Sequence, residues 1–232
     1  MGQRCSACTA SSSAPTAATA ATAPTHNNGL HEDSRMWENI ARRLEGSLVV
    51  LEPLEARHEE SLLEIAQDSE IWRWMPYNAI ETPESFHAWF EYAVAASVSG
   101  TQAAFAIREV HTHTLIGSTR YLTLRPEHRG LEIGWTWFSP SAWGTGANAE
   151  TKLWMLEHAF EDLGCIRVEF KTDAYNGRSH AALLALPARF EGVFRKHMLV
   201  SGGRLRDSAY YSIIDDEWHG VRSNLRRRLE GH

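Results

Sequence analysis

The sequence predicts an α+β domain in which helices pack on a mixed, mostly antiparallel sheet. Between residues 102 and 138, several short segments alternate apolar and polar residues, as half-buried antiparallel strands do. Segments with helical spacing of apolar residues stand before and after this block. Of the 232 residues, 43% are hydrophobic and nine are tryptophan, which is enough for one domain with a real core.

The elements are expected in the order β-α-α-β-β-β-α-β-α-β-β, with about seven strands. A strand over 48–51 begins the series, and an amphipathic helix follows it. The aromatic stretch SEIWRWMPYNAIETP reads as a loop. Thr82 is expected to cap the second helix, with Pro83 in its first turn and Gly100 ending it.

The remaining elements alternate regularly between strand and helix. In the strand over 130–138, Leu131, Ile133, Trp135 and Trp137 are expected to share one face, with Glu132 on the other. The other expected elements are strands over 102–110 and 114–124, a helix over 147–163, a strand over 165–173, a helix over 178–186, and strands over 189–199 and 207–215.

The chain divides by composition into three parts. Residues 1–43 form a leader, rich in Ala, Ser, Thr and Pro up to about residue 34, that cannot bury enough apolar surface to fold. Its start, MGQRCS, fits N-myristoylation with Cys5 available for a second acyl chain, while a transit peptide or a true start at Met36 stays open. Residues 44–218 are the folded domain, and residues 219–232 are a basic C-terminal helix or tail.

Composition also excludes several classes of function. A net charge of −6 gives no support for a nucleic-acid partner, and no apolar run reaches the roughly 18 residues of a membrane span. Three cysteines provide no disulfide framework, and the histidines show no metal spacing. We therefore expect a cytoplasmic protein without a metal, or an organelle-targeted or membrane-tethered one if the leader acts as a signal.

The segment PSAWGTGANAETK, residues 140–152, places two glycines at the start of the helix expected from residue 147. A helix N-terminus offers unpaired N–H groups to an anion, and Gly144 and Gly146 let the backbone approach phosphate oxygens closely. A Walker loop is excluded because Ala149 and Glu150 stand where its Gly-Lys would be. GTGANA does fit the dinucleotide pattern, but five residues separate it from the strand ending at Phe138, and that strand alternates.

Two blocks of sequence together resemble the GNAT acyl-CoA N-acyltransferases, in particular their RimJ/RimL-like branch. The first block is Glu132-Ile-Gly-Trp on a strand, followed by Pro140-x-x-Trp143-Gly144-x-Gly146 at a helix start. The second is Asp173-x-x-Asn176-x-Arg178-Ser179 with Phe-Glu-Gly after it. The resemblance covers about residues 44–218 and implies a GNAT-like fold with acetyl-CoA as co-substrate.

The resemblance places the coenzyme along this chain. It implies a diphosphate loop over 141–146 and a pantetheine arm passing Phe138, Asn176 and Ser179. The residues expected at the diphosphate are Trp143, Gly144, Thr145, Gly146, Ala147 and Asn148. Three positions depart from the family pattern: Ser141 replaces an Arg or Gln, Pro187 replaces a glycine, and Leu183 replaces a tyrosine that serves as acid for the leaving thiolate.

Acyl transfer to nitrogen requires a neutral amine, and a lysine-like amine of pKa about 10.4 is almost entirely protonated at pH 7. Glu132 is the candidate base, acting directly or through water, and a main-chain N–H near Trp137 or Phe138 is expected to meet the oxyanion. Trp74 and Tyr77 are the candidates for binding the acceptor, an amine-bearing small molecule or protein. A homodimer, a non-catalytic acyl-CoA sensor and an NAD(P)-dependent oxidoreductase stay open as alternatives.

Overall fold

The computed structural model describes residue 37 and residues 40–231. The expectations for lipidation at Gly2 and Cys5, for a transit peptide and for a start at Met36 fall outside these residues. Ile40 is buried in the main hydrophobic core, four residues before the expected domain boundary at Leu44. The packed part of the chain therefore begins within the segment assigned to the leader.

The sheet has eight strands in the order β1-β2-β3-β4-β5-β6-β8-β7, one more than expected because β1 is a two-residue strand. Only the β5–β6 pair is parallel. All the other neighbours pair antiparallel. The strands are β1 (Leu44–Glu45), β2 (Val49–Pro53), β3 (Ala103–Glu109), β4 (Leu115–Arg125), β5 (Gly130–Phe138), β6 (Arg167–Asp173), β7 (Arg189–Val200) and β8 (Arg204–Ile214).

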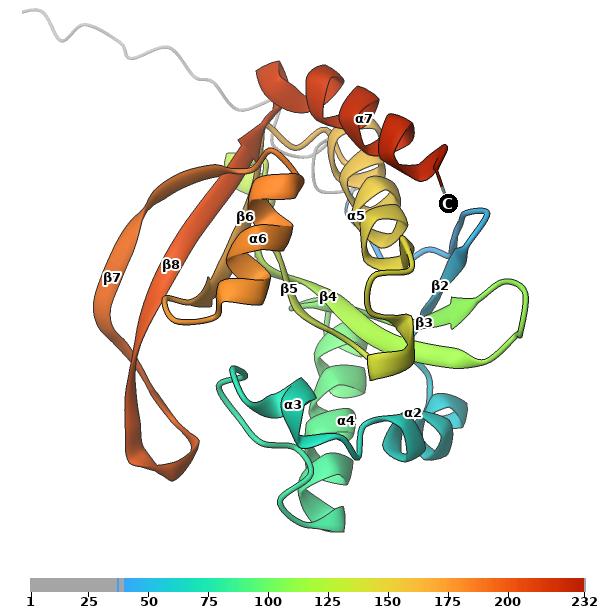
Figure 1. The fold of residues 1–232 in the computed structure, drawn as a ribbon, viewed down its shortest axis with the longest axis vertical. Helices are drawn as coiled ribbons and strands as arrows, with labels where there is room; N and C mark the ends of the chain where they lie inside the picture. The colour runs from blue at the N-terminus through green and yellow to red at the C-terminus, as the bar shows by residue number, and fades with distance from the viewer. Residues whose placement is uncertain (1–36, 38–39, 232) are drawn as a thin grey trace, which may run out of the picture.

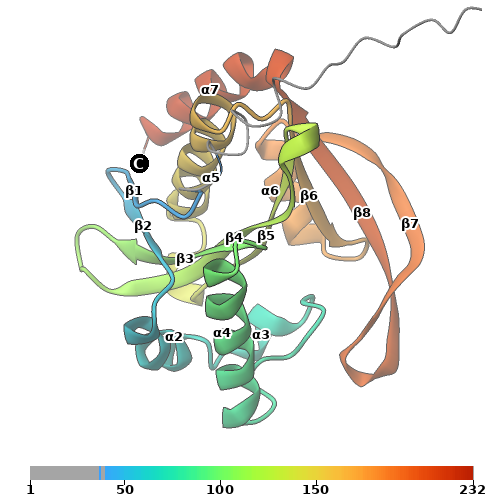
Figure 2. The same cartoon turned by 180° about the vertical axis from the view of Figure 1, so that it is seen from behind.

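Helices cover both faces of this sheet and bury two separate apolar clusters (Figures 1 and 2). Helices α5 and α7 lie together on one face over the larger core, and α2, α3 and α4 lie on the other. The helices are α2 (Glu59–Ile65), α3 (Ser69–Trp72), α4 (Pro83–Val98), α5 (Ala147–Glu157), α6 (Gly177–Ala185) and α7 (Asp215–Leu229). The expected α+β class is confirmed.

Several helix boundaries follow from local chemistry. The hydroxyl of Thr82 accepts a hydrogen bond from the Ser85 N–H at 3.2 Å and caps α4, as its sequence predicts. The expected aromatic loop contains α3, and the helix expected over 147–163 ends as a π-helical turn over residues 158–162. Helix α7 begins at Asp215 and buries Trp218, so it is part of the same fold.

The predicted alternation along β5 is wrong beyond Ile133, because the strand contains a bulge. Arg120 pairs with Gly134 and Ser118 with Trp137, so that Trp135 and Thr136 together lie opposite a single residue of β4. Trp135 has a φ of 49°, which is strained for a bulky side chain. The bulge reverses the faces: Leu131 and Ile133 join the larger core, whereas Trp135 and Trp137 pack against α2, α3 and α4.

Strands β5 and β6 separate soon after they begin to pair. Their parallel register covers three residue pairs and ends at Glu132 with Glu169, although β5 continues to Phe138 and β6 to Asp173. The remaining residues of each strand, 133–138 in β5 and 170–173 in β6, therefore have no partner on this side. Because a strand edge carries unpaired N–H and C=O groups, the separation creates a polar main-chain surface inside the fold.

A buried carboxylate joins the start of α5 to the first part of the sheet. Glu150 accepts hydrogen bonds from the N–H groups of Ser47, Leu48 and Val49 at 2.7–2.9 Å, and from the Ser47 hydroxyl at 2.8 Å. The side chain thus satisfies three main-chain donors that no strand pairs. It also fixes the position of the first turn of α5 relative to β2.

We predict that Glu150→Ala lowers the free energy of unfolding by about 3 kcal/mol, because it removes the acceptor of three main-chain donors, of which the Val49 N–H is buried. Urea unfolding measures the loss. Glu157→Ala is the matched control on the same helix, since its ion pair with Arg226 is partly exposed and contributes at most about 1 kcal/mol. Equal losses in the two variants would contradict this role for Glu150.

Candidate active site

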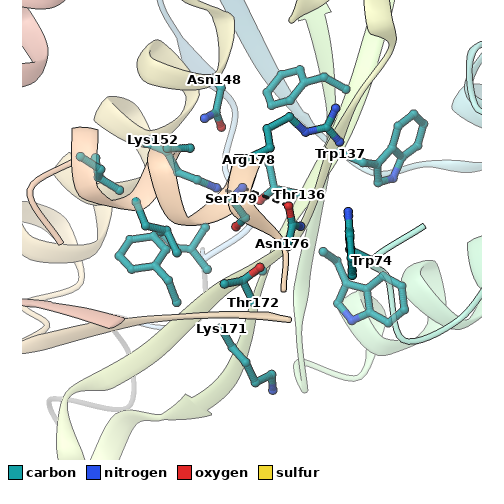
Figure 3. A pocket seen from close by; sticks show the side chains of 18 of the residues that line it. Trp74, Thr136, Trp137, Asn148, Lys152, Lys171, Thr172, Asn176, Arg178 and Ser179 are labelled. Atoms are coloured by element: carbon teal, nitrogen blue, oxygen red, sulfur yellow. Dashed lines mark hydrogen bonds between the residues drawn. The ribbon is translucent and has the colours of Figure 1, made fainter. Parts of the chain in front are cut away.

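A cavity of about 420 Å³ lies where β5 and β6 separate. Its walls come from the free parts of both strands, from α5 and α6, and from the loop that follows α3. Figure 3 shows these side chains pointing toward a common space from different elements. The cavity thus reaches from the glycine turn before α5 to the aromatic loop.

The glycine turn predicted before α5 lies at one end of the cavity. Gly144 and Gly146 have φ values of 79° and 83°, in the left-handed region that favours glycine. Gly146 is the N-cap of α5 and has no side chain that could accept from the first turn, and the Ala147 N–H has a long contact of 3.5 Å with the Thr145 hydroxyl. A Cβ added to Gly144 would meet no atom within 4 Å. The first N–H groups of α5 and the open space beside Gly144 therefore suit an anion.

Trp143 and Arg178 form one rim of the cavity. The indole N–H of Trp143 donates to the Phe138 carbonyl at 3.0 Å, which ties the turn to the end of β5. The guanidinium of Arg178 lies 3.9 Å from the centre of the Trp143 ring. This contact places a positive charge beside the turn, and Arg178 was not among the expected site residues.

Asn176 and Ser179 line the cavity from the start of α6, as Figure 3 shows. The Asn176 side-chain oxygen accepts a hydrogen bond from the Ser179 N–H at 3.1 Å and so caps the helix. Leu183 lines the same cavity one turn further along α6. An apolar side chain thus occupies the position where the family pattern has its acid.

Glu132 lies at the point where the two strands part. It is 4% exposed and lines the cavity. Its carboxylate accepts hydrogen bonds from the Thr123 hydroxyl at 3.3 Å and from the Lys171 ammonium group at 3.4 Å. The carboxylate is thus held in a polar setting at the base of the separation.

Lys152 is a cavity residue that the sequence gives no reason to single out. It projects from α5, is 7% exposed, and donates a hydrogen bond to the Thr136 hydroxyl at 2.7 Å (Figure 3). Burial lowers the pKa of its ammonium group from 10.5 to about 7. Lysines on a helix usually face solvent, and only the packing of α5 against the separated strands shows that this one does not.

The other expected site residues divide into two groups. Phe138, Gly144, Asn148 and Trp74 line the cavity, whereas Thr145, Gly146 and Ala147 stand beside it in the turn. Tyr77 points elsewhere, since its hydroxyl donates to the Ser85 carbonyl at 3.4 Å. Across residue 37 and residues 40–231, no group of three or more His, Cys, Asp or Glu side chains is arranged to hold a metal ion.

Comparison with known proteins identifies the family. The model of the acetyltransferase (GNAT) domain matches residues 49–187, more than half of the chain. This chain belongs to the GNAT acetyltransferases. The expected acyltransferase class is thereby confirmed, and the family uses acetyl-CoA as co-substrate. The match assigns the glycine turn to a GNAT domain, which excludes the dinucleotide-binding fold considered above.

Individual GNAT relatives agree with this assignment. An uncharacterized N-acetyltransferase, YnaD from Bacillus subtilis, is 24% identical over 74% of this chain and 96% of its own length. A GCN5-related N-acetyltransferase from Brucella melitensis superposes with a TM-score of 0.75 at 28% identity, over 81% of this chain and 85% of the other. Mycobacterium smegmatis RimJ, solved in complex with CoA-disulfide, shares the fold with a TM-score of 0.68 at 20% identity, over 81% and 93% of the two chains.

Membrane insertion has no candidate among the helices that the structure describes, because none is both long and apolar enough to cross a bilayer.

The lowered pKa of Lys152 predicts a pH dependence of stability. Between pH 7 and pH 10.5 the unfolded chain holds a proton on Lys152 that the folded chain has released, so the free energy of unfolding rises with pH in this window. Relative to Lys152→Met, the wild-type protein should gain about 2 kcal/mol between pH 7 and pH 9. Urea unfolding of both proteins at both pH values measures this, and parallel pH profiles would contradict the burial of a titrating amine.

Proposed function

We propose that this GNAT protein transfers an acetyl group from acetyl-CoA to a primary amine by direct attack on the thioester. The observation that carries the proposal is the continuous cavity between the separated strands, with an anion-binding turn at one end and an acidic side chain at the parting point. An extended donor fits this shape, because its charged part and its reactive part would lie at different places along one channel.

The diphosphate of acetyl-CoA would bind at the turn before α5. Main-chain N–H groups from Gly144 to Asn148 would donate to its oxygens, and the partial positive charge of the helix end would add to the attraction. Thr145 and Trp143 complete the turn. Support comes from the open space beside Gly144 and from the N-cap Gly146, which has no side chain to accept from the first turn of α5. The Arg178 guanidinium beside Trp143 supplies a further positive charge nearby.

The pantetheine arm would extend from the turn along the unpaired part of β5. Its amide groups can pair with the free N–H and C=O groups of that strand, as a neighbouring strand would. Phe138 lies at the turn end of this path, and Asn176 and Ser179 face it from α6. The thioester would then reach the bulge, where an N–H near Trp137 or Phe138 would stabilise the oxyanion.

Glu132 would take the proton of the attacking amine, directly or through a water molecule. Its place at the parting of β5 and β6 puts a carboxylate at the end of the expected path of the arm. The acceptor would come from the side of Trp74, where the loop after α3 meets the β7–β8 hairpin. That contact is made by Ser201, which donates its N–H to the Pro76 carbonyl at 3.1 Å. The acceptor must carry a primary amine, as a protein N-terminus, a lysine side chain and a small polyamine all do.

A non-catalytic acyl-CoA sensor is the second candidate, favoured by Leu183 in the cavity where an acid is expected. Detection of free thiol in mixtures of acetyl-CoA with a panel of amines separates the two. Thiol release that depends on both the protein and an amine supports the transferase. Tight acetyl-CoA binding without thiol release for any amine of the panel would contradict the proposed activity and favour the sensor.

We predict that Gly144→Ala weakens acetyl-CoA binding by at least about tenfold, because the added methyl group would enter the space assigned to the diphosphate and strain the turn. Isothermal titration measures the affinity. Gly100→Ala is the matched control: Gly100 ends α4 with a φ of 70° and also has no atom within 4 Å of an added Cβ. Equal effects of the two variants on binding would show that only backbone strain is being measured.

We predict that Glu132→Gln lowers turnover by about 10²-fold at pH 7 while acetyl-CoA affinity stays within a factor of about three. The amide keeps the shape and the hydrogen-bond acceptor but cannot take a proton. Glu169→Gln is the control, since Glu169 is the register partner of Glu132 on β6 and is held by Arg125 and Arg167. Unchanged turnover at every pH in Glu132→Gln removes this residue from the mechanism.

A further inference from the structure

The Lys152 amine is buried without a compensating carboxylate. Its one hydrogen-bond partner among the described residues is the Thr136 hydroxyl, at 2.7 Å. The Thr136 hydroxyl lies 2.8 Å from the Thr119 hydroxyl. Thr136 can therefore donate its own proton to Thr119 while it accepts a hydrogen bond from Lys152. A buried cation without a counter-ion destabilises a fold, so an apolar side chain of similar length would be the more stable choice here. The position of this amine therefore calls for a functional reason.

Two of the three donors of the ammonium group remain available to a ligand. A lysine ammonium donates up to three hydrogen bonds and accepts none, and Thr136 takes one of them. The amine faces the cavity from the α5 wall, opposite the free part of β5 (Figure 3). Other charged side chains line the same cavity, but none of them is hydrogen-bonded to Lys152: Glu132, Lys171, Arg178, Arg206 and Arg228.

The proposed reaction needs an acid or a cation beside the leaving sulfur, and the Lys152 amine lies in the same cavity. When the amine of the acceptor has attacked, the C–S bond of the thioester breaks and the sulfur keeps the electron pair. The leaving group is a thiolate whose conjugate thiol has a pKa of about 8.5. At neutral pH it leaves more readily if a cation or an acid lies beside the sulfur. Leu183 cannot do this, although it faces the same cavity. Thr136, the partner of Lys152, belongs to the bulge at which the thioester is expected.

We propose that the Lys152 ammonium group is the acid that protonates the sulfur of coenzyme A as the thioester is cleaved. The step rests on the proposed function. The C–S bond breaks, the electron pair passes to sulfur, and one proton moves from Nζ to sulfur. Lys152 is then a neutral amine, which regains a proton from solvent after the products leave. Glu132 removes the proton of the acceptor amine on the other side of the reacting carbon.

The burial of Lys152 fits this role. Because no charged neighbour offsets it, the loss of solvent alone lowers the pKa of the amine to about 7. An acid transfers its proton most effectively when its pKa lies near the working pH. The rate should consequently fall as pH rises above the pKa of Lys152, because the amine then has no proton to give.

Two measurements test the proposal: the pKa of the thiol in bound CoA, and the dependence of turnover on pH. Each is made on the wild-type protein, on Lys152→Met and on Lys152→Arg. The ultraviolet absorbance of the thiolate gives the pKa of the thiol in bound CoA without any turnover. We expect that pKa to be lower in the wild-type protein and in Lys152→Arg than in Lys152→Met, because a thiolate beside Lys152 would hold the proton on the amine. Turnover at pH 7 should fall by about 10²-fold in both variants, since arginine keeps the charge but is too weak an acid. The decline of activity above pH 7 should disappear in both.

An unchanged thiol pKa in Lys152→Met, or turnover within twofold of wild type with the same pH profile, would overturn the role of Lys152. CoA affinity and thermal unfolding are measured on each variant. A loss of turnover that is explained by weaker CoA binding or by unfolding would also overturn the role of Lys152. The failure of the proposed function looks different. In that case the wild-type protein releases no thiol with any amine, whereas the thiol titration of bound CoA still reports on Lys152.

Discussion

The separation of β5 from β6 is the constraint on which the site depends. The two parallel strands pair over three residues and then part, and residues of α5 and α6 line the cavity between them. The parting leaves main-chain donors and acceptors free in a place that is otherwise well packed. Unpaired buried backbone is unfavourable unless something satisfies it, and the extended, amide-bearing arm proposed above would pair with these groups.

The bulge at Trp135 and Thr136 decides which side chains face each side of this opening. It turns Trp135 and Trp137 toward α4, where they pack with Trp89. The same reversal brings Thr136 to the side of α5, within 2.7 Å of Lys152. A strained φ at Trp135 is thus the local requirement for a hydroxyl and a buried amine to meet beside the free strand edge. The contact of Thr136 with Lys152 and the packing of the two tryptophans against α4 both arise from one irregularity in one strand.

Much of the fold follows from sequence because its signals are local. Thr82 with Pro83 marks the start of α4, and the spacing of Gly144 and Gly146 marks the start of α5. The bulge was missed because the alternation of β5 continues through it in the sequence, and no glycine marks the residue with positive φ. A two-residue strand such as β1 is likewise too short to leave a pattern.

The site divides in the same way. The glycine turn could be predicted because it depends on residues that are neighbours in the chain. Lys152 and Arg178 could not, because their roles depend on which elements face each other across the cavity. Tyr77 and Trp74 belong to the same aromatic loop, but the loop turns the Tyr77 side chain toward α4. Residue type alone does not give a side chain its direction.

A crystal structure of this protein with CoA bound would show directly whether the separated strands hold the coenzyme. We expect the diphosphate on the main-chain N–H groups from Gly144 to Asn148, the arm along the free edge of β5, and the sulfur within hydrogen-bond reach of Lys152. CoA bound outside the separated strands, or with its diphosphate away from the glycine turn, would contradict this expectation.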